Sequence, residues 1–167
     1  MYFEIIQVMA EVAGALIGFV GVVFVLGGRA VRSLTTVERN GMLHLLIGSI
    51  GTLLVSITTM ILLAALGEDL AWRISAGICA VYAFSGATKA IGEELAGTHS
   101  LPVPFNWALP ILALCAGSAS AAAAAGMLPG YAALTTVLTM LMGLVVAVTY
   151  FVSLLTGYYG PDQSPDA

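Results

Sequence analysis

The sequence predicts an all-α protein, a polytopic bundle of five transmembrane helices. Its composition is the first observation, because 60% of the 167 residues are hydrophobic and only 8% are charged. Soluble domains carry about 25% charged residues, so this chain has too few polar side chains to cover a core in water. Long uncharged runs are the second observation, because a spanning helix needs about 20 mostly apolar residues. The surface is therefore expected to face lipid.

The expected spans lie at about 5–28, 41–66, 70–91, 106–127 and 131–157. The last two form one uncharged run that is too long for a single helix, and the turn residues Leu128-Pro129-Gly130 divide it. Residues 1–159 are interpreted as one transmembrane domain. The polar tail, 160–167, is expected to be disordered and cytoplasmic.

The third span is the shortest. Its uncharged core between Arg73 and Lys89 covers only about 22 Å at 1.5 Å per residue. Both cations can extend to opposite interfaces, where Trp72 would be an anchor. The alternative is a helix lying in the interface, which would leave four spans. This run lacks the continuous charged face of an interfacial helix, so five spans are favoured.

Positive residues give the expected orientation, because cytoplasmic loops are enriched in Lys and Arg. Arg29, Arg32 and Arg39 all fall in the first loop, which places the N-terminus outside and the C-terminus in the cytoplasm. The composition is rich in Ala and Gly, and the chain has no glycosylation sequon. Both features favour a plasma membrane location in a bacterium, that is, the inner membrane.

The first span carries a stripe of polar and small residues, at steps of three and four that place them on one helix face. The stripe consists of Glu4, Gln7, Glu11, Gly14, Gly18 and Gly21. Close helix packing is one interpretation, since Gly14 and Gly18 form a GxxxG motif. The other is a face that lines an aqueous path or an axis between protomers, with carboxylates that favour cations. The opposite, apolar face is expected to meet lipid.

Glu11 favours the functional interpretation. It lies about ten residues into the span, or about 15 Å deep, where a charged carboxylate costs at least a few kcal/mol. No Lys or Arg is expected at that depth, so the candidate partners are hydroxyl groups, water, a cation or Glu11 of another protomer. The hydroxyls at matching depth belong to Thr52, Ser56, Tyr82, Ser118 and Thr139. We therefore predict that Glu11 binds a proton or a cation.

The second span carries a glycine stripe next to a hydroxyl stripe. Gly48 and Gly51 are predicted to pack against another helix. Thr52 and Ser56 belong to the hydroxyl stripe, which either bonds back to its own helix or lines a path.

Three further polar residues are secondary candidates. His44 is expected to face or cap the cytoplasmic interface, with a proton relay as the alternative. Its depth does not match that of Glu11, so a direct pair is not expected. Tyr82 and Lys89 share one face of the third span, and Lys89 is predicted to neutralise Glu93 one turn further on.

An enzyme is not expected, because neither histidine has an obvious Ser or Cys nucleophile beside it. Cys79 and Cys115 stand alone in apolar runs, so no metal site and no cofactor is predicted. The chain has no basic cluster for nucleic acid.

Two functions remain. The first is an oligomeric permeation or transport unit for a cation or proton, with the first span lining the path. The second is an accessory or scaffold subunit of a larger membrane complex, with no transport of its own. The expected partners are the lipid bilayer and either further copies of this chain or other membrane subunits.

Overall fold

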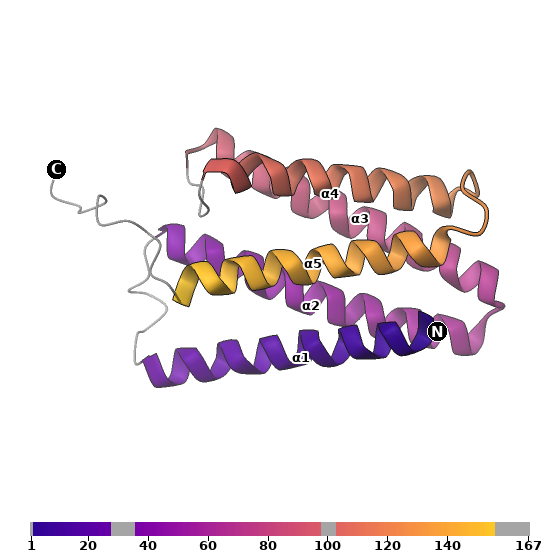
Figure 1. The fold of residues 1–167 in the computed structure, drawn as a ribbon, viewed down its shortest axis with the longest axis horizontal. Helices are drawn as coiled ribbons and strands as arrows, with labels where there is room; N and C mark the ends of the chain where they lie inside the picture. The colour runs from indigo at the N-terminus through magenta and orange to yellow at the C-terminus, as the bar shows by residue number, and fades with distance from the viewer. Residues whose placement is uncertain (1, 28–35, 98–102, 156–167) are drawn as a thin grey trace, which may run out of the picture.

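The computed structural model describes residues 2–27, 36–97 and 103–155. These residues form five helices: α1 (Tyr2–Gly27), α2 (Thr36–Ala65), α3 (Glu68–Leu95), α4 (Val103–Ala124) and α5 (Ala132–Leu155). All five run side by side along the length of the molecule (Figure 1). Each is long and apolar enough to cross a membrane. The prediction of an all-α bundle with five candidate spans is confirmed.

α3 shows how the shortest predicted span reaches full length. It contains 28 residues, which corresponds to about 42 Å of helix. The helix continues through charged residues at both ends, from Glu68 in its first turn to Glu93 in its last. Acidic residues in a first turn stabilise a helix by interacting with its dipole. α3 is therefore a candidate membrane span that packs along α4, and the structure favours this over a helix lying in the interface.

The chain reverses between α4 and α5 around Leu128-Pro129-Gly130, as the turn residues predicted. Gly126 and Gly130 have φ angles of 79° and 80°, a region that is costly for residues with a side chain. Arg73 of α3 donates from Nε to the carbonyl oxygen of Ala124 at 3.2 Å. A cation at a helix C-terminus interacts favourably with the unpaired carbonyls, so Arg73 fixes the end of α4 to α3.

The ends of the bundle are named here by their residues. The His44 end is where α1, α3 and α5 end and where α2 and α4 begin, and the Glu68 end is the opposite one (Figure 1). α1 lies at one edge and packs on α2 and, over a shorter contact, on α5. α4 lies at the other edge. The loop with Arg29 and Arg32 and the tail 160–167 fall outside the described residues.

The two cysteines provide a test of this packing. Cys79 is fully buried and its Sγ lies 3.8 Å from the carbonyl oxygen of Thr136, whereas Cys115 is exposed on α4. At alkaline pH, N-ethylmaleimide is expected to modify Cys115 faster than Cys79 in detergent, because the thiolate is the reacting form and only the Cys115 thiol is exposed. Mass spectrometry of the wild type and of Cys115→Ala checks this expectation. Rapid modification of Cys79 in the folded variant would contradict the α3–α5 packing.

Candidate functional site

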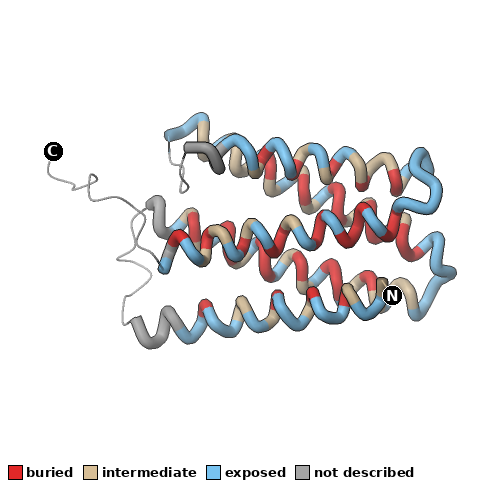
Figure 2. The backbone as a smooth tube through the Cα atoms, in the orientation of Figure 1, coloured by how far each residue is buried: buried red, intermediate tan, exposed pale blue. Residues whose placement is uncertain are grey.

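The polar face of α1 points away from the bundle. Among the α1 residues whose side chains the structure describes, 2–22, the buried ones are Ile6, Met9, Ala13 and Val20. Figure 2 shows the buried positions of α1 on the side toward the rest of the bundle. Glu4, Gln7 and Glu11 are exposed on the opposite side. The expectation that the apolar face turns away from the bundle holds only in part, because Ile6 and Met9 instead complete the hydrophobic core. Other apolar residues of α1 are exposed, among them Phe3, Val8 and Phe19.

Glu11 has its partner on its own helix. Gln7 Nε2 donates to Glu11 Oε1 at 3.3 Å, and no other described side chain bonds to Glu11. The glycines of the stripe are Gly14, Gly18 and Gly21. A Cβ atom added to any of them would meet no described atom within 4 Å. Within one chain, this glycine stripe therefore does not pack against another helix.

The hydroxyls proposed as partners of Glu11 lie elsewhere. Thr52 and Ser56 are fully buried on the side of α2 that faces α5. Thr52 Oγ1 lies 3.5 Å from the carbonyl oxygen of Met140, and Ser56 Oγ lies 3.7 Å from Met140 Sδ. Ser118 is exposed on α4, and Thr139 bonds to Ser120 at 2.9 Å. The structure therefore brings none of these groups to Glu11.

Gly48 and Gly51 lie where α2 approaches its neighbours most closely. A Cβ added to Gly48 would lie 2.9 Å from the carbonyl oxygen of Gly143 and 3.1 Å from Ala147 Cβ. At Gly51 it would overlap the ring of Tyr82. The absence of a side chain at these two positions lets α5 and Tyr82 approach the backbone of α2.

Glu93 is the centre of a charged cluster that joins two helices. Its Oε2 lies 2.6 Å from His44 Nε2 on α2, and its Oε1 accepts a hydrogen bond from Lys89 Nζ at 2.7 Å. The side chain of His44 is 8% exposed and that of Glu93 is 15% exposed. The His44 ring stacks on Tyr150 of α5, with centroids 4.7 Å apart. Two helices therefore hold the cluster and a third holds the imidazole ring.

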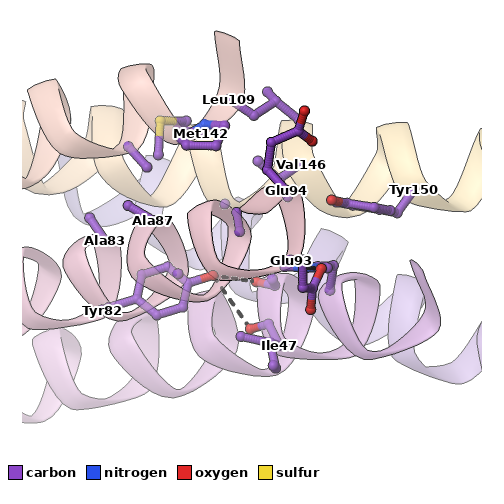
Figure 3. Close-up of a pocket in the computed structure, with 17 residues that line it drawn as sticks. Ile47, Tyr82, Ala83, Ala87, Glu93, Glu94, Leu109, Met142, Val146 and Tyr150 are labelled. Atoms are coloured by element: carbon purple, nitrogen blue, oxygen red, sulfur yellow. Dashed lines mark hydrogen bonds and ion pairs between the residues drawn. The ribbon is translucent and has the colours of Figure 1, made fainter. Parts of the chain in front are cut away.

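A cavity of about 80 Å³ lies beside the cluster (Figure 3). Its polar lining consists of His44, Tyr82, Glu93, Glu94 and Tyr150, and the remainder is mainly small or apolar. Figure 3 shows Tyr82 and Tyr150 on opposite sides of the pocket, with their hydroxyl groups turned toward its middle. Tyr82 donates to the carbonyl oxygen of Gly48 at 3.2 Å. One water needs about 10–15 Å³ by this measure, so the cavity has room for several.

The sequence identified His44, Tyr82 and Lys89 separately but missed what unites them. The expected contact between Lys89 and Glu93 is present. The His44 ring, predicted to face or cap the interface, is buried within the bundle and paired with Glu93. The sequence did offer one signal for this contact, because His44 and Glu93 lie at similar depths near the same end of the bundle. Tyr150 and Glu94 carried no distinctive sequence pattern.

The cluster combines the groups that proton exchange requires. An imidazole changes charge near neutral pH, and a carboxylate beside it can stabilise its cationic form. The neighbouring cavity offers room for the water that would deliver or remove the proton. Among the described residues, no group of three or more His, Cys, Asp or Glu side chains is placed to hold a metal ion.

Comparison with known proteins finds no matching protein family, curated protein or solved structure. The functional inference therefore depends on the geometry of this chain.

Proposed function

We propose that the protein is a membrane transport protein that moves protons, or another small cation, across the bilayer. The observation that carries this proposal is the His44–Glu93–Lys89 cluster beside a cavity inside a membrane-spanning bundle. Ionisable side chains within membrane helices are costly, and they usually mark ion or proton pathways.

Charge balance within the cluster supports proton exchange at His44. Lys89 lies against Glu93, so the carboxylate keeps a cationic partner whether or not His44 is protonated. His44 can therefore gain a proton from the cavity, and lose it again, without leaving Glu93 as an unpaired buried charge. An unpaired buried charge is strongly destabilising, so this arrangement lowers the cost of both states.

Buried hydroxyl groups continue from the cavity toward the Glu68 end. The Tyr82 hydroxyl lies between α2 and α5 near Thr52, and a bonded pair of Ser120 and Thr139 lies further along. A hydroxyl both donates and accepts, so successive hydroxyls and intervening waters can pass a proton. The close packing at Gly48 and Gly51 favours a proton over a hydrated metal ion along this route.

The outward face of α1 supports an oligomer. Glu11 faces lipid in a single chain, and a carboxylate near the bilayer centre is costly there. In a dimer, the lipid around Glu11 would be replaced by the Gln7 amide and the Glu11 carboxyl group of the second copy. Gly14 and Gly18 would let the two backbones approach closely. In this arrangement Glu4 and Glu11 face the interface between protomers, where they can share a proton or a cation.

Filling the glycine stripe is expected to prevent assembly. Gly14→Leu/Gly18→Leu should convert an oligomer to a monomer without unfolding it, because a Cβ at either position meets no described atom of its own chain. Light scattering of the purified protein in mild detergent measures the change in mass. Val12→Leu, an exposed position off the stripe, is the matched control and should remain oligomeric. A monomeric wild type would contradict assembly through α1.

An accessory subunit is the second candidate, since the same α1 face would also accept a helix of another membrane protein. A monomer that co-purifies with a defined membrane complex would favour this role, whereas a symmetric homo-oligomer favours transport. We further propose that the N-terminus is outside, in the inner membrane of a bacterium, with the His44 end in the cytoplasm. Protonation would then be coupled to the cytoplasmic pH.

Reconstitution tests the proposed transport directly. Liposomes that contain the purified protein and a pH-sensitive dye should acidify or alkalinise when a potassium diffusion potential of either sign is imposed. Empty liposomes give the background rate. Proton flux no faster than this background, together with no flux of sodium or potassium, would overturn the proposal.

A further inference from the structure

We infer that an apolar groove between α1 and α5 binds one hydrocarbon chain of a membrane phospholipid. The groove is open toward the surface of the bundle and has a volume of about 620 Å³. α2 packs on both helices, whereas α1 and α5 meet only over a short contact, so a space remains between them. Figure 1 shows α1 and α5 as neighbours along the length of the molecule. The inference goes beyond the proposed transport function and does not depend on it.

The walls of the groove are hydrocarbon. The side chains that form them are about half exposed, and they are Val8 and Val12 of α1 and Leu141, Val145 and Val148 of α5. Met9 and Leu144 line the groove from the buried core. A valine side chain has one strongly preferred rotamer in a helix, so the valines of these walls cannot rotate inward to fill the space. The groove therefore persists, and its surface matches an apolar chain.

Charge is confined to one end of the groove. Among the described residues that line it, only Glu4 is charged, and it lies in the first turn of α1. Thr149 is the other polar residue, and its hydroxyl group already donates to the carbonyl oxygen of Val145 at 2.8 Å. Beyond Thr149, the rings of Phe19 and Phe151 meet edge to face, with centroids 5.2 Å apart. The groove therefore leads from the start of α1, near the level of the lipid headgroups, toward the centre of the membrane.

The size of the groove agrees with one acyl chain. Its α1 wall extends from Glu4 to Val12, eight steps of 1.5 Å, or about 12 Å. One leaflet of the hydrocarbon core is about 15 Å thick, so an acyl chain covers a similar depth. A cavity of about 150 Å³ holds the six carbons of benzene, so about 620 Å³ corresponds to about 25 carbon atoms. An acyl chain of about 16 carbons therefore fits.

A helix of a second copy is a poorer match for this groove. A helix about 10 Å wide and 12 Å long occupies about 940 Å³, so only part of it would enter. A flexible chain fills the space and gains the dispersion contacts that a partly seated helix leaves unmade. The polar and glycine stripe of α1 also lies beside the groove, because Glu4 is the one stripe residue that lines it. A lipid chain and a second copy can therefore be bound together.

Native mass spectrometry of the full-length protein tests the inference, with dipalmitoylphosphatidylcholine as the probe. A sterol-based detergent such as CHAPS is used, because it has no long alkyl chain that would compete for the groove. One lipid should bind saturably per protein chain. Dibutyrylphosphatidylcholine has the same headgroup but short chains, and it should bind at least about tenfold more weakly. Equal binding of the two lipids, or no saturable binding at all, would overturn the inference.

Filling the groove should displace the lipid. Val8→Phe/Val145→Phe adds a ring to each wall and should reduce the bound fraction at least about tenfold at subsaturating lipid. Val22→Phe/Val81→Phe makes the same changes at exposed positions outside the groove and should bind as the wild type does. Unchanged binding by the folded groove variant, or equal loss in the control, would contradict the site. A wild type that binds no lipid but forms a dimer, which the groove variant abolishes, would assign the groove to a second copy and overturn the inference.

Photolabelling keeps the test informative if the groove variant does not fold. Phosphatidylcholine is prepared with a diazirine either near the glycerol end of one chain or near its methyl end. In the wild type, the first probe should label α1 around Glu4 and Ile5, and the second should label α5 around Val148. Excess dipalmitoylphosphatidylcholine should suppress both reactions. Equal labelling of exposed α4 residues such as Ile111 and Leu112 would show only general contact with lipid and would overturn the inference.

Discussion

Glu93→Gln is expected to reduce proton flux into liposomes by at least about tenfold. The amide cannot accept a proton as a carboxylate does, and it removes the charge that stabilises protonated His44. Lys89 is 34% exposed, so its ammonium group is free to extend to the interface, and the variant should still fold. Dye-reported flux under an imposed potential measures the effect. Glu68→Gln is the control at the opposite end of α3, and its flux should equal that of the wild type.

His44→Phe separates proton exchange from ring packing in the same assay. Phenylalanine can stack on Tyr150 as the imidazole does, but it has no titratable nitrogen. If His44 exchanges the proton, His44→Phe should lose flux to the same extent as Glu93→Gln. Folded variants of both kinds that conduct at the wild-type rate would refute the role of the cluster.

Gly48→Ala is expected to destabilise the bundle by about 1–3 kcal/mol, the usual cost of overpacking a close contact. The new methyl group would lie 2.9 Å from the carbonyl oxygen of Gly143. That atom belongs to the backbone of α5, so it cannot rotate away as a side chain can, and the two helices must separate. Titration with sodium dodecyl sulfate, followed by tryptophan fluorescence, measures the free energy of unfolding.

Gly18→Ala is the matched control for this prediction. It makes the same chemical change in another candidate span, but its methyl group meets no described atom within 4 Å. Alanine has a higher helix propensity than glycine by about 1 kcal/mol, so this control should be neutral or slightly stabilising in the monomer. Equal stability of Gly48→Ala and Gly18→Ala would contradict the close approach of α2 and α5.

The helices themselves were predictable because the length of an apolar run is a local property. The turn at Leu128-Pro129-Gly130 was predictable for the same reason, since it depends on the residues within it. The helix ends differed by a few residues. α2 begins at Thr36 and α3 at Glu68, because a helix can continue through polar residues beyond the apolar run. Hydrophobicity thus located the candidate spans more accurately than their ends.

The direction of the α1 stripe required the tertiary structure. Periodicity showed that Glu11 and the glycines share a face, but in lipid both a polar face and an apolar face can turn inward. The groove beside α2 and α5 is filled by Ile6, Met9 and Ala13, whose shapes complete the core. Glu11 was consequently left on the outside, where no described group of the bundle other than Gln7 bonds to it.

In the charged cluster, too, the sequence determined one contact and the tertiary structure determined the other. The sequence by itself determined the pair of Lys89 and Glu93, because residues four apart on a helix are neighbours whatever surrounds them. Only the tertiary structure brought His44 to Glu93, 49 positions away on another helix. That meeting depends on how α2 and α3 are rotated against each other, and the rotation is fixed by packing contacts such as Gly51 against Tyr82. Such contacts join side chains from different helices, so no single segment of the sequence encodes them.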